Sequence, residues 1–71
     1  MLPSPYERVE RIRESIDELE AAGIAVSTID EIELRHLVRE HEDFLQCMLG
    51  YDASMHELLD LIESQRLVRQ N

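Results

Sequence analysis

Apolar residues recur at helical spacing in three stretches of the chain, each separated from the next by helix-stopping residues. No stretch follows the two-residue alternation of a β-strand. The pattern therefore predicts an all-α fold, a small three-helix bundle with helices at about 5–22, 29–49 and 54–68. The connector 24–27 is itself apolar enough to lie against the bundle.

Local signals mark the ends of these helices. Ser4, Thr28 and Ser54 are each followed three residues later by a glutamate, which is the capping-box spacing at a helix N-terminus. Gly23 and Gly50 follow the first two stretches, and glycine readily takes the left-handed conformation that ends a helix. We expect helix boundaries at these five positions.

The middle stretch carries more apolar surface than one neighbouring helix could bury. On a continuous helix its main stripe faces one direction, while further apolar residues and His36 lie on the opposite side. We expect the stripe and the matching seams of the other helices to form the core, which would contain Val9, Ile12, Ile16, Leu19, Leu34, Leu37, Val38, His41, Phe44, Leu45, Met48, Leu58, Leu59 and Ile62. The surplus predicts a partner-binding or dimer interface formed by Ile29, Ile32, His36, Cys47, Leu61 and Val68.

Chain length favours self-association. The 71 residues predict one helical domain with flexible ends at 1–4 and 69–71, and a single core of this size supplies only roughly 3–5 kcal/mol of net stability. Small chains without disulfides often gain the remainder by oligomerising. We therefore predict a homodimer in which two copies form a larger helical bundle.

Charge and cysteine content limit the partners and the compartment. Sixteen acidic residues against seven basic ones, all arginine, give a formal charge of −9, which repels nucleic-acid phosphates and anionic lipid. No apolar run approaches the ~20 residues that cross a bilayer. Cys47 is the single cysteine, so no internal disulfide can form, and we read no leader segment. These features predict a cytoplasmic protein that binds neither nucleic acid nor membrane.

One metal-binding alternative rests on a histidine motif. Glu33 and His36 have the Glu-x-x-His spacing that ferritin-like di-iron proteins use, and Glu40 follows one turn later. The motif occurs once, so only a symmetric oligomer could complete such a site. Our main interpretation therefore includes no metal and no cofactor, and it treats His41 as a core or interface histidine.

The segment 49–55 resembles the phosphopantetheine-attachment site of acyl carrier proteins, with Ala53 inserted between Asp52 and Ser54 where that family has aspartate and serine adjacent. The resemblance implies a carrier role for Ser54, which is also suited to cap the third helix. We find no Ser-His-Asp set, no glycine-rich phosphate loop and no zinc-binding spacing, and we predict no enzymatic activity.

The combined pattern predicts a small acidic cytoplasmic regulator or adaptor of the kind encoded by bacteria and phages. It would act by protein–protein interaction, through an exposed apolar helix face with acidic rims that suit a basic partner surface. Two alternatives remain open at this point. One is an anionic inhibitor that mimics nucleic acid in a basic partner groove, and the other is a metal-binding helical oligomer that uses the Glu-x-x-His motif.

Overall fold

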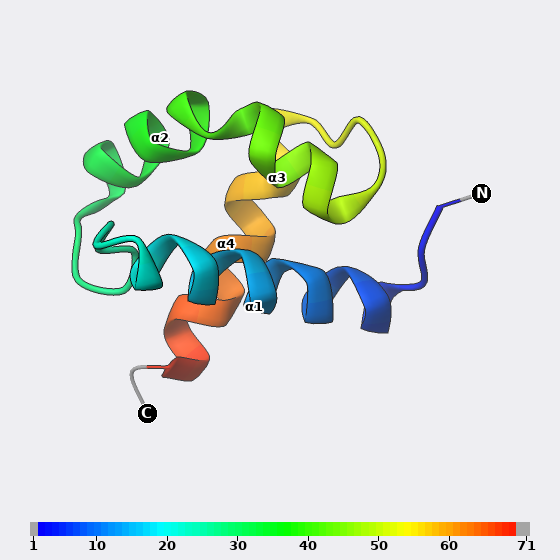
Figure 1. The fold of residues 1–71 in the computed structure, drawn as a ribbon, viewed down its shortest axis with the longest axis horizontal. Helices are drawn as coiled ribbons and strands as arrows, with labels where there is room; N and C mark the ends of the chain where they lie inside the picture. Colours follow the sequence, from blue (N-terminus) through cyan, green and yellow to red (C-terminus); the bar gives the residue numbers. More distant parts are fainter. Residues whose placement is uncertain (1, 70–71) are drawn as a thin grey trace.

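The computed structural model describes residues 2–69, and this part of the chain forms four helices (Figure 1). They are α1 (Pro5–Ala21), α2 (Glu31–Glu40), α3 (Glu42–Leu49) and α4 (Met55–Arg69). The all-helical prediction is confirmed, but the prediction of three helices is wrong. Residues 1 and 70–71, which fall within the predicted flexible ends, lie outside the described part. None of the helices in residues 2–69 is long and apolar enough to cross a membrane.

The predicted helix 29–49 is divided at His41. The backbone there has φ −112° and ψ 21°, outside the α-helical region. The backbone N–H of His41 donates to the carbonyl oxygen of Leu37 at 3.0 Å, and the ring Nδ1 lies 2.9 Å from the same oxygen. Glu42 and Asp43 then place negative charge in the first turn of α3, where the helix dipole favours it. A new helix therefore begins directly after His41.

The start of α2 also differs from the prediction. Asp30 is the N-cap, because its Oδ1 accepts the backbone N–H of Glu33 at 2.8 Å. The pair Asp30 and Glu33 thus takes the capping-box spacing that was assigned to Thr28 and Glu31. α2 consequently begins two residues later than expected, at Glu31.

Ser4, Gly23, Gly50 and Ser54 lie at helix ends as expected, although α1 ends at Ala21 instead of residue 22, and α4 spans Met55–Arg69 instead of 54–68. The Oγ of Ser4 accepts a backbone N–H three residues ahead at 3.2 Å, and the Oγ of Ser54 does the same at 3.1 Å. Gly23 and Gly50 follow α1 and α3 with φ of 89° and 84°, the left-handed region that favours glycine.

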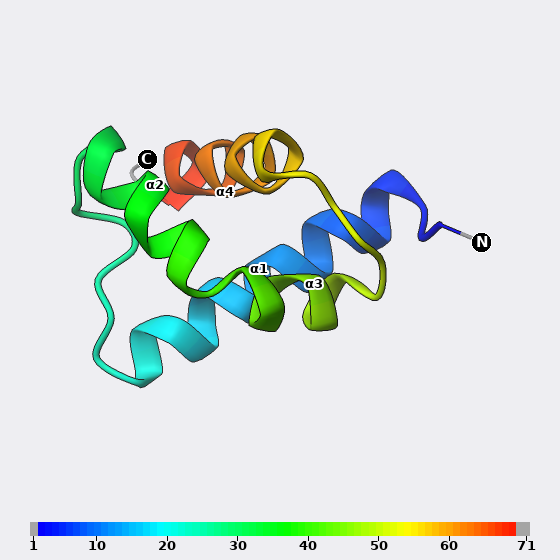
Figure 2. The same cartoon turned by 90° about the horizontal axis from the view of Figure 1, so that it is seen from above.

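α1 and α4 cross each other, and α2 and α3 run one after the other along the same side of the pair (Figure 1). Figure 2 shows α1 and α4 in separate layers. α1 packs against α4 and α3, while α2 packs against α4 and α3. The two halves of the predicted middle helix therefore have different principal partners, α4 for α2 and α1 for α3.

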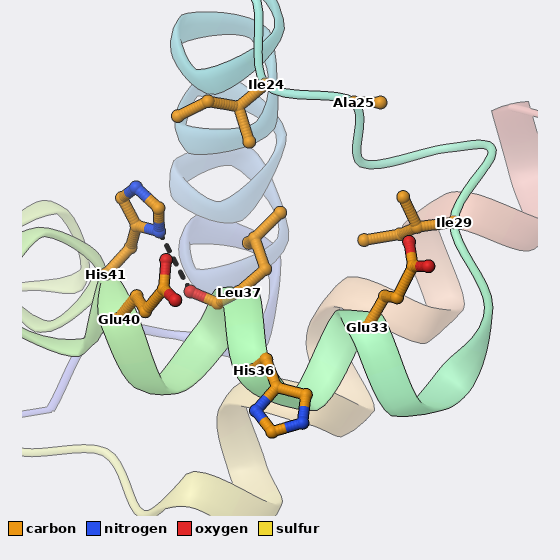
Figure 3. Close-up of a pocket in the computed structure, with 8 residues that line it drawn as sticks. All are labelled: Ile24, Ala25, Ile29, Glu33, His36, Leu37, Glu40 and His41. Carbon is orange, nitrogen blue, oxygen red and sulfur yellow. Dashed lines mark hydrogen bonds between the residues drawn. The ribbon is translucent and has the colours of Figure 1, made fainter.

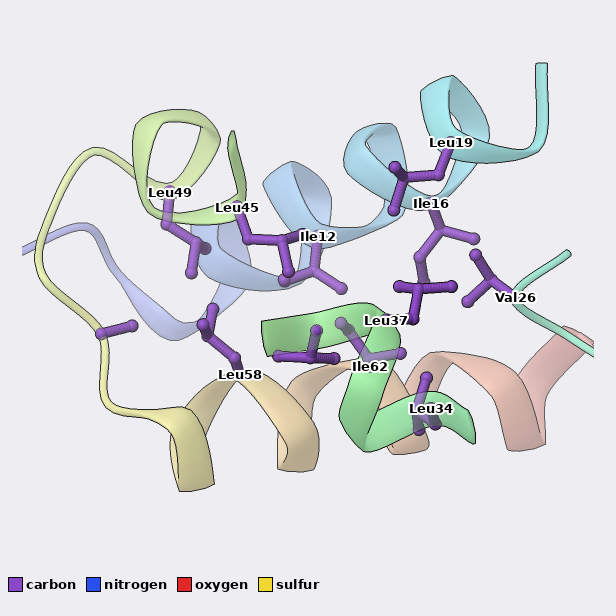
Figure 4. Close-up of a cluster of buried hydrophobic side chains, with 12 residues drawn as sticks. Ile12, Ile16, Leu19, Val26, Leu34, Leu37, Leu45, Leu49, Leu58 and Ile62 are labelled. Atoms are coloured by element: carbon purple, nitrogen blue, oxygen red, sulfur yellow. The ribbon is translucent and has the colours of Figure 1, made fainter. Parts of the chain in front are cut away.

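The core lies where these helices meet (Figure 4). Its buried apolar residues are Ile12, Ile16, Leu19, Val26, Leu34, Leu37, Val38, Leu45, Leu49, Ala53, Leu58 and Ile62. Five residues that were also expected in the core are only half-buried, namely Val9, His41, Phe44, Met48 and Leu59. Val26 and Ala53, which belong to connectors, complete the core in addition to the helical residues.

Two arginines join segments that are far apart in the sequence. Arg11 of α1 donates from Nη1 to the carbonyl oxygen of Leu49 at 2.6 Å, at the end of α3. Arg66 of α4 donates from Nη2 to the carbonyl oxygen of Ile29 and pairs through Nη1 with Glu63 at 2.8 Å. Because charged donors make strong hydrogen bonds, these contacts hold segments that are 38 and 37 residues apart in sequence.

Candidate functional site

α2 buries one side and leaves the rest of its surface open. Leu34, Leu37 and Val38 are buried against the core, whereas the other positions of the helix are exposed. This exposed surface forms two different environments, one on each side of the helix. The larger is a pocket beside the connector that leads into α2.

The pocket has a volume of about 500 Å³ and lies between α2 and the α1–α2 connector (Figure 3). Ile24, Ala25 and Ile29 contribute its connector side, and Leu37 contributes apolar surface from α2. We call it the α2 pocket, and its lining residues are Ile24, Ala25, Ile29, Glu33, His36, Leu37, Glu40 and His41.

The polar groups of the α2 pocket are two carboxylates and two imidazoles. Glu33 and Glu40 are exposed, and both rise from α2 on the side of the connector (Figure 3). The His41 ring stands at one end of the pocket, held by its contact with the carbonyl of Leu37. An apolar surface with carboxylates at its edge can hold an apolar group that has a cation nearby.

The arrangement does not bring the Glu-x-x-His motif together as a ligand set. Figure 3 shows the His36 ring directed away from Glu33 and Glu40. Within residues 2–69, no group of three histidine, cysteine, aspartate or glutamate side chains is placed to hold a metal ion. A metal-binding oligomer would therefore need ligands from a second chain.

The predicted interface residues occupy several places. Ile32 is 70% exposed on α2 and Val68 is 62% exposed near the end of α4, while His36 and Cys47 are exposed as well. Ile29 and Leu61 are half-buried and pack against the core. Three further large apolar residues that were not assigned to the interface are also exposed, namely Leu2 at 58%, Tyr6 at 75% and Leu67 at 63%.

A separate polar cluster connects α1, the α3–α4 connector and α4. The Tyr51 hydroxyl donates to Oε1 of Glu57 at 2.9 Å, and the Arg8 guanidinium carbon lies 5.7 Å from the centre of the tyrosine ring. Burial raises the pKa of Tyr51 above its ordinary value of 10.0, and the hydrogen bond and charge of Glu57 raise it further. Arg8 acts in the opposite direction. Arg8 also donates from Nε to the carbonyl oxygen of Pro3 at 3.0 Å, so the contacts of this cluster join parts of the chain to one another and we interpret it as structural.

The segment that resembles a carrier-protein site forms the start of α4. The Oγ of Ser54 accepts the backbone N–H of Glu57, and the carbonyl of Ala53 accepts a hydrogen bond from the Gln46 side chain at 3.1 Å. Ser54 thus acts as a helix cap in this structure.

Comparison of the chain with protein-family models, with curated protein sequences and with solved structures gave no significant match. The functional argument therefore depends on the geometry of the chain itself. The connector residues that complete the α2 pocket have a signal in the sequence, because Ile24 and Ile29 are apolar in a short segment between helices. The pocket was not foreseen, because the path of that connector depends on tertiary contacts such as the one between Arg66 and Ile29.

Proposed function

We propose that this chain is a small regulatory or adaptor protein that binds another protein through the α2 pocket and catalyses no reaction. The observation that carries the proposal is the combination of an open apolar surface with two carboxylates at its edge, in a pocket of about 500 Å³. Partner side chains that enter such a pocket bury apolar area, and the carboxylates favour partners with a cation next to the apolar group.

The spacing of the carboxylates indicates the kind of partner. Glu33 and Glu40 are seven residues apart on one helix, which corresponds to about 10 Å at 1.5 Å per residue. This distance suits an extended or helical segment with an apolar anchor between two arginines or lysines. The acidic rims expected for the binding face are thus supported by two named side chains.

The connector side of the pocket is held in place by two side-chain contacts. Arg66 donates to the carbonyl of Ile29 and also pairs with Glu63. Ser27 donates to Oε2 of Glu20 at 3.0 Å, which joins the connector to the end of α1. A surface that is ordered before binding pays less conformational entropy when the partner arrives. These contacts support a binding role for the pocket.

The proposal is tested by photo-crosslinking in the native cell. A photoreactive amino acid replaces Ala25, which is exposed and lines the pocket, and in a control chain it replaces Ala21, which is exposed at the end of α1. We expect a defined protein adduct at position 25 that is absent at position 21 and is lost when Glu33→Lys and Glu40→Lys are added. Identical adducts at both positions, or none at either, would refute the proposal.

The same experiment separates the nucleic-acid-mimic alternative. A partner held by the general acidic surface would give adducts at position 21 as well, since this position lies beside Glu18 and Glu20. Its binding would also fall steeply as salt is added, whereas binding to an apolar pocket depends only weakly on salt.

We further propose that the chain forms a homodimer. The support comes from the end of α4, where Leu67 and Val68 expose 63% and 62% of their surface next to each other in sequence. Sedimentation equilibrium at micromolar concentration is expected to give twice the chain mass of 8.3 kDa, and Leu67→Ser with Val68→Ser is expected to restore the monomer. A monomeric wild type under these conditions would contradict the dimer and leave the pocket proposal intact.

A further inference from the structure

We propose that the outward side of α2 is a second binding surface, which takes an acidic segment of a partner protein. This outer face consists of Ile32, Arg35, His36 and Arg39, which together line a hollow of about 210 Å³. Apart from His36, which lines both, its residues are distinct from those of the α2 pocket.

The outer face includes a large apolar residue that the chain leaves uncovered. Ile32 is 70% exposed, although the buried core is complete without it. An exposed isoleucine alone is an ordinary surface feature. Here it lines a hollow together with Arg35 and Arg39, so an apolar side chain that docks on Ile32 would have cations next to it, toward the end of α2.

The arginines of the outer face differ from the others in the described part of the chain. The side chains of Arg35 and Arg39 make no hydrogen bond and no ion pair within residues 2–69. Arg35 also lines a hollow that includes Asp60 and Glu63, yet no carboxylate lies within 4.0 Å of it. The other arginines with described side chains each lie within 4.0 Å of a carboxylate, and they are Arg8, Arg11, Arg13 and Arg66.

This contrast identifies the partner chemistry. In a chain with a formal charge of −9, carboxylates are abundant, and the two arginines are nevertheless directed to solvent. Their spacing of four residues corresponds to about 6 Å along the helix, and guanidinium groups form bidentate pairs with carboxylates. The outer face therefore suits a partner segment that carries glutamates or aspartates next to an apolar anchor, on the side that faces Arg35 and Arg39.

Charge also argues against two other occupants. A second copy docked symmetrically through the same face would place Arg35 and Arg39 against their own equivalents, which costs like-charge repulsion. Nucleic acid would bring a long array of phosphates against a strongly acidic molecule, where a short peptide brings only a few carboxylates, and its backbone offers no apolar side chain to cover Ile32.

The test measures the anisotropy of a labelled synthetic helical peptide with leucines on one face and glutamates beside them. We expect this peptide to bind the full chain, and we expect Arg39→Glu and Ile32→Ser each to weaken binding about tenfold, equivalent to about 1.4 kcal/mol. The matched control is Arg13→Glu, because Arg13 is an exposed arginine paired with Glu10 on α1, and its reversal changes the net charge equally. This control is expected to leave affinity within about twofold.

The remaining outcomes are also decisive. Failure of the peptide to bind, or equal weakening by Arg39→Glu and Arg13→Glu, would overturn the proposal. A labelled DNA duplex that binds with the same dependence on Arg39 would assign the face to phosphates, and self-association abolished by Arg39→Glu would assign it to a second copy. Either result would also overturn it. The α2 pocket is tested separately, because Glu40→Lys is expected to leave the glutamate peptide bound.

Discussion

Replacement of Gly50 by alanine should destabilise the chain more than the same change at Gly23. Both glycines end a helix with positive φ, at 84° and 89°, so both substitutions force a residue with a Cβ into the left-handed region. Their surroundings differ. A Cβ on Gly23 would meet nothing within 4 Å, whereas a Cβ on Gly50 would lie 2.8 Å from Nη1 of Arg11.

The expected magnitudes follow from these two contacts. The left-handed conformation costs a non-glycine residue about 1 kcal/mol, which is the whole effect at Gly23. At Gly50 the Arg11 guanidinium must also move, and it then loses its 2.6 Å hydrogen bond to the carbonyl of Leu49. That loss adds about 1 kcal/mol, because the arginine is part-exposed and water replaces some of the bond. We expect losses of about 1 kcal/mol for Gly23→Ala and about 2 kcal/mol for Gly50→Ala.

Urea unfolding followed by circular dichroism measures both losses, and a double-mutant cycle assigns the difference. In an Arg11→Ala background the Cβ at position 50 has nothing to displace, so Gly50→Ala should cost no more than Gly23→Ala. Equal losses for the two glycine variants in the wild-type background would refute the reasoning. So would an excess at Gly50 that persists without Arg11.

Three further predictions concern stability. The pKa of Tyr51 is raised in the folded chain, so folded and unfolded chains both keep the phenol proton at pH values below 10.0, and at higher pH the unfolded chain loses it first. The free energy of unfolding should therefore fall as the pH rises above this value. Urea unfolding at successive pH values should show a steeper fall in the wild type than in Tyr51→Phe. Arg66→Met should cost about 2 kcal/mol, because it removes the donor to the carbonyl of Ile29, and thermal unfolding checks this value. Ile32→Ser should leave stability within about 0.5 kcal/mol, whereas Ile12→Ala, at a position with 0% exposure, should cost about 2–5 kcal/mol in the same assay.

Helix ends could be predicted where the deciding contacts are local. Ser4 and Ser54 cap helices through a backbone N–H three residues ahead, and Gly23 and Gly50 adopt the conformation that their residue type favours. Such contacts involve only a few neighbouring residues. At the start of α2 the capping-box spacing occurs twice, at Thr28 and at Asp30, and the local pattern alone does not decide which of the two residues caps the helix.

The break at His41 could not be found from periodicity. The apolar stripe continues through this residue with helical spacing, so a single helix accounts for it equally well. In the folded chain the stripe is shared between α4, which packs on α2, and α1, which packs on α3. The available signal was the acidic pair Glu42 and Asp43, which is typical of a helix start.

Periodicity could predict only part of the candidate site. Exposure of Ile32 and Val68 agrees with their position opposite the core stripe, which periodicity can indicate. The α2 pocket depends instead on where the connector lies, and this is set by contacts across more than thirty residues, such as that between Arg66 and Ile29. Contacts of this kind have no signature in local sequence.

The packing of α1 has a consequence for synthesis on the ribosome. α1 packs chiefly on α3 and α4, and α2 packs on α4 and α3, so the earliest part of the chain has few contacts with the helix that immediately follows it. While residues 55–69 are still inside the ribosome, α1 and α2 both lack the helix that packs against them. Their apolar faces then remain in water. Stable folding should therefore begin only after α4 has left the exit tunnel, so the four helices are expected to fold together as one unit.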